Sequence, residues 1–253
     1  MPFEQSRRTF PNPHYGSGVA RRHIRLTAHS GYVESHLVDI FHELRCRVEH
    51  DGRVITRVTG EAIRVPTSAC PSAVAVLEEL VGMEIGTDMA TFYADGRARR
   101  NCTHLFHLAV LCAAQAGRAE PNRTYEAIVP DETDSPVEIS VLCDGAEVHR
   151  WTIRSGKITH PQSLAGQPLL AGFTSWASKA FTGPALEAAN VLSQTYFIAQ
   201  ARRYDTDAVA GEVLGINSPM LGVCFAYSPS QVETARYLGG NYRDIPGTDT
   251  ISD

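Results

Sequence analysis

Apolar and polar residues alternate along several short stretches of this chain, a pattern that predicts β-strands. Residues 20–29 place apolar side chains at every second position, and residues 43–65 do so on both sides of Asp51-Gly52. The same pattern surrounds Asp144-Gly145 within residues 137–153. Asp-Gly dipeptides favour tight hairpin turns because they tolerate positive φ. Further strands at 32–41 and 125–129 bring the expected total to about eight.

Apolar residues recur at steps of three and four elsewhere, which predicts amphipathic helices. One helix is expected from Pro71 to Gly82 or Gly86, and another from Asn101 to Gly117. A short helix at 173–180 and a long one from Gly183-Pro184 to about Tyr204 complete the set. Residues 87–100 are expected to be a linker, and 159–172 a loop.

Consecutive hairpins, rather than alternating strands and helices, predict an α+β fold. We expect a curved antiparallel sheet or a partly closed barrel, packed by three to four helices. The expected division is a flexible N-terminal arm or surface strap at 1–18, one α+β catalytic or binding domain at 19–205, and an irregular C-terminal extension at 206–253. The last dozen residues are expected to be disordered.

Composition narrows the functional classes. The chain has 253 residues, 43% of them hydrophobic, and a formal charge of -5, which argues against a general nucleic-acid binder. Short arginine clusters at Arg7-Arg8, Arg21-Arg22 and 97–100 are expected to be solvated surface. No apolar run approaches the ~20 residues of a membrane span. The six cysteines form no CxxC pair and no export signal is visible, so reduced thiols in a cytoplasm are expected.

The segment Asn101-Cys102-Thr103-His104-Leu105-Phe106-His107 gathers a thiol and two imidazoles at the start of a predicted buried helix. Asn101 or Thr103 can cap this helix, and the positive end of its dipole would lower the pKa of the Cys102 thiol. His104 and His107 share a helix face and could bind a metal or hold each other in place. The alternative is a capped helix with satisfied core histidines and an inert cysteine.

Two other places could carry chemistry. A carboxylate of Asp39 or Glu43 could orient His42, but the three converge only if a bend intervenes at Ile40-Phe41, because strand residues alternate sides. The alternative is a set of solvated edge residues. Cys70, just before Pro71 and a predicted helix, is either a reactive thiolate or a buried structural cysteine.

Aromatic residues with polar tips could line a pocket for an aromatic ligand, and a core position is the alternative for each. They include Tyr32, Tyr93, Tyr125, Trp151, Trp176, Tyr196 and Tyr227. No GxGxxG, GxSxG, HExxH or phosphate-binding glycine loop is present, which argues against nucleotide cofactors and ordinary serine hydrolases.

These motifs resemble an uncharacterised bacterial family of unknown function whose hallmark reads Gly-Cys-Thr-His-Leu. Here the hallmark reads Asn101-Cys102-Thr103-His104-Leu105, with Asn101 in place of the glycine. The resemblance extends over about residues 20–205. It includes residues 37–39, which precede 41–44 and lie where the family tends to show His-Asp-Met. It also includes residues 66–70 followed by 80–82, residues 161–166, and the helix that ends near 201–203.

One branch of that family is similar to the γ-formaldehyde lyases that act on lignin-derived phenylcoumaran dimers. The resemblance implies a cofactor-independent lyase that releases formaldehyde from a phenolic aromatic substrate, without a bound metal. His104 or His42 would be the base, Asp39 or Glu43 would orient it, and Tyr93 or Tyr125 would donate to the departing phenoxide. Cys70, Cys102, Phe41 and Trp176 would line the substrate slot.

Two other functional classes remain open. Cys102, His104 or His107 could form a zinc or iron site with His42 or Cys70. The chain could instead be a non-catalytic binding module or a partner subunit. The helix at 184–204 would suit either a core or the interface of a homo-oligomer.

Overall fold

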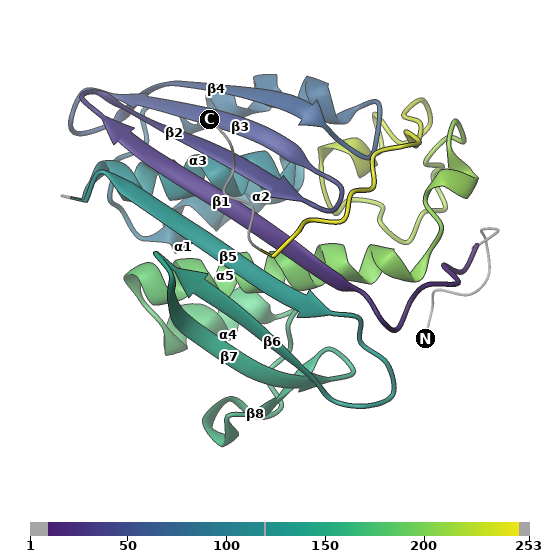
Figure 1. The fold of residues 1–253 in the computed structure, drawn as a ribbon. Coiled ribbons are helices and arrows are strands. Elements are labelled where there is room, and N and C mark those ends of the chain that lie inside the picture. The colour runs from purple at the N-terminus through teal and green to yellow at the C-terminus, as the bar shows by residue number, and fades with distance from the viewer. Residues whose placement is uncertain (1–9, 119, 248–253) are drawn as a thin grey trace.

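The computed structural model describes residues 10–118 and 120–247 of the chain. Within them, eight antiparallel strands form one curved sheet in the order β4-β3-β2-β1-β5-β6-β7-β8 (Figure 1). The strands are β1 (Val19–His29), β2 (Tyr32–Asp39), β3 (Glu43–His50), β4 (Ile55–Arg64), β5 (Asn122–Pro130), β6 (Val137–Cys143), β7 (Ala146–Arg154) and β8 (Lys157–His160). Strands β4 and β8 lie at the two edges, so the sheet is open and the curved sheet, rather than the barrel, is the correct alternative.

The sheet consists of two four-stranded meanders that meet where β1 pairs with β5. The expected hairpin turn between β6 and β7 is confirmed, because Asp144 and Gly145 have φ of 52° and 79°. Positive φ at both positions gives the turn the twist that the flanking strands need. Strand β8 lies partly in the stretch that we expected to be a loop.

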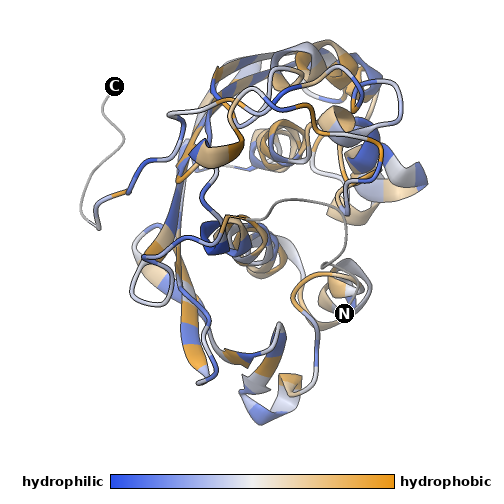
Figure 2. Ribbon diagram, turned by 90° about the vertical axis from the view of Figure 1, so that its right-hand side faces the viewer, coloured by the Kyte–Doolittle hydropathy of each residue, from blue (hydrophilic) through white to orange (hydrophobic). Residues whose placement is uncertain are grey.

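In the described part of the chain, five α-helices accompany the sheet: α1 (Met89–Tyr93), α2 (Arg97–Arg100), α3 (Thr103–Ala116), α4 (Phe173–Ala180) and α5 (Gly183–Ala199). The two longest, α3 and α5, lie against the same face of the sheet (Figure 2). Helix α3 packs on β1, β2 and β3, and α5 packs on β1, β5 and β6. The core therefore lies between these two helices and one face of the sheet.

Three local expectations were wrong. Residues 70–80 form the 3-10 helix η1 (Cys70–Leu80) rather than an α-helix, and the expected linker at 87–100 holds α1 and α2. Helix α3 is capped by neither Asn101 nor Thr103. Its N-cap residue is Cys102, whose side chain makes no capping hydrogen bond. The Asn101 amide instead donates to Glu79 and to the carbonyl of Arg97.

Residues 10–18 lie as a strap, one of the two arrangements expected for the N-terminal segment; residues 1–9 lie outside the described part. Asn12 N–H donates to the Arg203 carbonyl at 3.0 Å. The backbone N–H groups of Gly16 and Gly18 each donate to Asp131 Oδ2 at 2.9 Å. Asp131 in turn pairs with buried Arg202, so the strap is fastened to a charged pair beneath it.

The replacement Gly18→Ala is expected to lower the free energy of unfolding by about 1–3 kcal/mol, because the added methyl would overlap the Arg202 guanidinium. Arg202 cannot move away cheaply, since its Nε donates to Asp131 at 2.6 Å in a buried site. Urea unfolding measures the change, and Ser17→Ala at the exposed neighbouring position is the control. Equal stabilities of the two variants would contradict the prediction.

The C-terminal segment, residues 206–247, contains short 3-10 turns and lies over the ends of several core elements. Phe225 N–H donates to the Asn101 carbonyl at the start of α3, and Arg243 N–H donates to the Ile40 carbonyl after β2. This segment crosses from the helical side toward the outer face of the sheet (Figure 1). The residues after 247 lie outside the described part, so the expectation of disorder for them stays a prediction.

None of the helices in residues 10–118 and 120–247 has the length and apolar character needed to cross a membrane.

Candidate functional site

A cluster of buried polar side chains interrupts the core between α3, α5 and the sheet. We call it the buried histidine cluster. Its members are Arg22 from β1, Asp39 from the end of β2, His42 from the bend that follows, His104 from α3 and Gln194 from α5. Three of the five were candidates from the sequence.

Arg22 and Asp39 form the ion pair of the buried histidine cluster. Arg22 Nη2 lies 2.6 Å and Nε 3.1 Å from Asp39 Oδ2, and both side chains are at most 1% exposed. The sheet register places the two residues directly opposite each other on adjacent strands. Our expectation that Arg21-Arg22 is solvated surface was therefore wrong for Arg22, which shares the inward phase of Ala20 and Ile24.

Asp39 also shapes the bend that brings His42 into the cluster. Its Oδ1 accepts hydrogen bonds from the backbone N–H groups of Phe41 and His42, at 2.9 and 2.8 Å. The same oxygen lies 3.0 Å from His42 Nδ1. On the outer side, the Arg64 guanidinium donates to the carbonyls of Asp39 and His42. A bend at Ile40-Phe41, which the sequence required for convergence, is thus present.

These contacts keep Asp39 ionised. Burial by itself would raise the pKa of Asp39, but the Arg22 guanidinium and the His42 imidazole outweigh that effect, His42 through its hydrogen bond and through its charge whenever it is protonated. The pKa of this carboxyl therefore lies well below its ordinary value. An ionised carboxylate can only accept hydrogen bonds, so His42 Nδ1 carries a proton, and in the neutral form of the ring Nε2 is the basic nitrogen.

His104 is the second imidazole of the cluster, with its ring centroid 4.3 Å from that of His42. Its Nδ1 lies 3.4 Å from Arg22 Nη2 and 3.4 Å from Gln194 Oε1. Burial holds the pKa of His104 well below its ordinary value, helped by the charge of Arg22 and by that of His42 whenever His42 is protonated, so the His104 ring is neutral. A guanidinium only donates, so a hydrogen bond from Arg22 requires the tautomer in which His104 Nδ1 accepts and Nε2 carries the proton. The Gln194 oxygen only accepts, so a hydrogen bond to it requires the other tautomer, with the proton on Nδ1.

His107 lies one turn further along α3 and is 1% exposed. Among residues 10–118 and 120–247, neither ring nitrogen has a hydrogen-bond partner. Burial and the charge of Arg22 lower the pKa of His107 to about 3, with the nearby Gln194 side chain opposing them. His107 is therefore a neutral core residue next to the cluster. The alternative from the sequence, core histidines with hydrogen-bond partners, does not describe it.

The pKa of the Cys102 thiol is raised, whereas the sequence led us to expect a lowered one. Burial raises the pKa of Cys102 to about 12, although the backbone N–H groups of Leu105 and His104 act in the opposite direction. The cost of desolvating a thiolate exceeds the favourable effect of the helix start. Cys70 is 7% exposed and burial also raises the pKa of its thiol, which favours the buried structural cysteine over the reactive thiolate. Cys70 and Cys224 are close enough to Cys102 to raise its pKa further.

Glu43 and Tyr93 lie away from the cluster. Glu43 Oε1 is 3.5 Å from His36 Nε2 on the outer face of the sheet, opposite to the face that carries Asp39. Tyr93 packs edge-on against Phe106, two residues beyond His104 and therefore about 200° around α3. Burial raises the pKa of Tyr93, and among the described residues its hydroxyl has no hydrogen-bond partner.

Tyr125 and Trp176 belong to other groups of side chains. The Tyr125 hydroxyl donates to Glu187 Oε2 at 2.5 Å, in a network with Arg118. Trp176 packs against other aromatic rings near β7, and its Nε1 donates to the Pro168 carbonyl. Phe41 does adjoin the cluster, because it precedes His42, and Tyr242 of the C-terminal segment packs edge-on against its ring at 5.6 Å.

The cluster can transfer protons between two adjacent imidazoles. One is oriented by the Asp39 carboxylate, and the other contacts the Arg22 guanidinium. No three His, Cys, Asp or Glu side chains in residues 10–118 and 120–247 are arranged to hold a metal ion. An imidazole held by a carboxylate beside a second imidazole is an arrangement that can transfer protons.

Comparison with known proteins identifies a domain but no activity. Residues 23–118 match the family model described as a protein of unknown function (DUF2889). This stretch contains Asp39, His42 and His104, whereas Gln194 comes from beyond it. No curated protein matches the chain.

Proposed function

We propose that this protein, whose residues 23–118 form a DUF2889 domain, is a cofactor-independent carbon–carbon lyase that uses His42 as its base. The single observation that carries the acid–base part is the 3.0 Å contact of His42 Nδ1 with ionised Asp39, beside a second neutral imidazole. The substrate class, a phenolic aromatic dimer with a hydroxymethyl group, comes from the resemblance of the 101–105 hallmark to the lyase branch.

The two histidines take complementary roles in this proposal. His42, with Nδ1–H held by Asp39, presents Nε2 to accept a proton from the substrate hydroxyl. His104, with Nδ1 accepting from Arg22, presents Nε2–H to donate. Two neighbouring groups held in different protonation states are a common arrangement for acid–base catalysis. This assigns the donor role to His104, in place of Tyr93 or Tyr125.

The proton transfers balance without a redox partner. His42 Nε2 removes the proton of the hydroxymethyl group, whose oxygen forms the carbonyl of formaldehyde as the adjacent C–C bond breaks. The released electron pair forms a C=C bond and expels the aryl oxygen from the neighbouring carbon. His104 Nε2–H protonates that phenoxide. The products are formaldehyde and a stilbene, and the net proton passes from His104 to His42 through the substrate.

Substrate entry requires the C-terminal segment to move. His42 and His104 are only 4% and 5% exposed. Tyr242 covers Phe41, while Arg64 donates to the Asn241 carbonyl and to the two carbonyls of the bend. These contacts fix the segment over the cluster, so water is kept away from the imidazoles. Exclusion of water strengthens the interaction of the charged intermediate states with Asp39 and Arg22.

The test is formaldehyde release from a phenylcoumaran dimer that carries its hydroxymethyl group. We expect one formaldehyde per stilbene formed, and no turnover of the dimer that lacks the hydroxymethyl group. His42→Gln and His104→Gln are each expected to lower kcat by about a hundredfold, the typical contribution of a positioned acid or base. His14→Gln, the same exchange at an exposed position, is the control.

Unchanged turnover in both His42→Gln and His104→Gln would exclude this mechanism. Binding of the dimer without formaldehyde release in the unaltered protein would instead indicate the non-catalytic binding module.

A further inference from the structure

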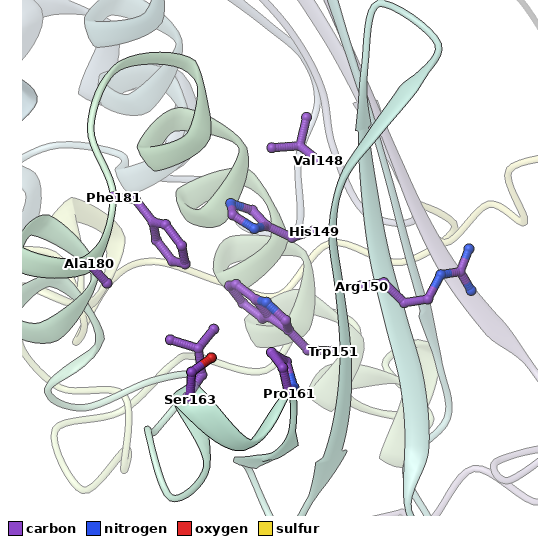
Figure 3. Close-up of a pocket in the computed structure, with 9 residues that line it drawn as sticks. Val148, His149, Arg150, Trp151, Pro161, Ser163, Ala180 and Phe181 are labelled. Atoms are coloured by element: carbon purple, nitrogen blue, oxygen red, sulfur yellow. The ribbon is translucent and has the colours of Figure 1, made fainter.

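A cavity of about 440 Å³ lies between β7, the turn after β8 and the end of α4 (Figure 3). Its lining residues are Val148, His149, Arg150, Trp151, Pro161, Ser163, Leu164, Ala180 and Phe181. Figure 3 shows the rings of His149, Trp151 and Phe181 around one space, whereas the Arg150 side chain points the other way. Arg150 binds Glu138 and Glu147 on the outer face instead.

The walls of this cavity are aromatic. The His149 and Phe181 ring centroids are 4.5 Å apart, and Trp151 lies nearly parallel to Phe181, at 15° and 6.3 Å. Trp176 adds a further ring 6.0 Å from Phe181. Trp151 is 2% exposed and forms a firm floor. These rings pack directly on one another, so a flat ligand ring would lie against the parts of them that border the cavity, where offset and edge-on contacts are both available.

One wall also carries a directed hydrogen-bond acceptor. His149 Nε2 lies 2.7 Å from the Ala185 carbonyl. A carbonyl only accepts, so Nε2 carries the proton and Nδ1 of the neutral ring is left as an acceptor. Burial lowers the pKa of His149, which keeps the ring neutral. The Ser163 hydroxyl is a second polar group in the lining.

The cavity is separate from the buried histidine cluster. His149 contacts the first turn of α5 at Ala185, whereas the cluster includes Gln194. Gln194 comes nine positions after Ala185 in α5, which is about 14 Å along the helix axis. Binding here does not depend on the proposed lyase activity.

We propose that this cavity is a binding site for a small molecule with one planar aromatic ring and a hydroxyl substituent. Its volume falls within the range of small-molecule sites, and its lining combines aromatic rings with the polar groups of His149 and Ser163. The ligand ring would lie in the cavity against Phe181 and His149, with Trp151 beneath it, and the hydroxyl would donate to His149 Nδ1.

The chain offers a direct probe, because its only two tryptophans, Trp151 and Trp176, both lie in this aromatic group. Titration with benzyl alcohol is expected to change their fluorescence saturably. Cyclohexylmethanol, which keeps the hydroxyl but lacks the flat ring, is expected to bind at least tenfold more weakly. Calorimetry on the same samples confirms that the fluorescence change reports binding.

Two variants test the location. Phe181→Leu removes one wall, and Ala180→Leu fills the space from an exposed position that should not disturb folding. Each is expected to weaken benzyl alcohol binding at least tenfold. Phe225→Leu, which lies in the C-terminal segment, is the control. No saturable change with benzyl alcohol, equal affinity for the two alcohols, or unchanged affinity in Ala180→Leu would each overturn the proposal.

Discussion

The variant Asp39→Asn is expected to lose about 3–5 kcal/mol of unfolding free energy, because it leaves the guanidinium of Arg22 buried without a counter-charge. Arg22 is fully buried, and its other contacts are the neutral side chains of Gln194 and His104. Neither can replace a carboxylate at 2.6 Å. The amide also presents one acceptor oxygen where the carboxylate presents two, so either Arg22 or the bend at Phe41-His42 loses hydrogen bonds.

Urea unfolding at neutral pH measures this loss. The matched control is Asp95→Asn, since Asp95 also faces an arginine, Arg97 at 3.6 Å, but is 79% exposed. Exposed ion pairs contribute at most about 1 kcal/mol, so this control should remain near the stability of the unaltered protein. A loss in Asp39→Asn as small as that in Asp95→Asn would show that Arg22 is hydrated or that its charge is neutralised elsewhere.

The strands followed closely from local patterns because buried and more exposed side chains alternate along them. The hairpins with Asp-Gly dipeptides formed near their expected positions, as did the helices expected at 101–117, at 173–180 and from Gly183, although α3 is buried on nearly every side and residues 70–80 form a 3-10 helix. The short elements could not be predicted from such patterns. Helices α1 and α2 are only 5 and 4 residues long, too short to show a repeat, and β8 has 4 residues.

The site was only partly visible in the sequence, for two physical reasons. Arg22 occupies the inward phase of an alternating strand, so the pattern that predicted β1 already marked it as buried. Its neighbour Arg21 made the pair look like a surface cluster. Gln194 had no such signal, because its role depends on where α5 packs relative to β1, and no local repeat determines that.

The prediction of a lowered pKa for Cys102 was wrong because burial, which raises the pKa, outweighs the start of α3, which lowers it. A helix start lowers a thiol pKa only when the thiolate is solvated or paired with a cation. Sequence shows the helix start but not the depth of burial. Cys102 is 7% exposed, and burial therefore determines its pKa.

Protein stability is expected to fall steeply with acid, and His107 should be a main cause. The pKa of this buried ring is about 3 in the folded chain, against an ordinary value of 6.5. Between these values the unfolded chain binds a proton at His107 and the folded chain does not, so stability decreases as pH falls. The expected slope is about 1.4 kcal/mol per pH unit, or about 5 kcal/mol over the whole interval. His104, whose pKa is also lowered, acts in the same direction.

The variant His107→Gln should remove the His107 part of this slope, since glutamine does not titrate. Unfolding free energies measured by urea at several pH values between about 6.5 and 4 provide the comparison. The unaltered protein should lose about 1.4 kcal/mol per pH unit more than His107→Gln does. His14→Gln, the same exchange at an exposed position, should retain the full slope. Parallel curves for the unaltered protein and His107→Gln would mean that the folded chain accepts a proton at His107, and thus that water or a counter-charge reaches α3 beside the buried histidine cluster.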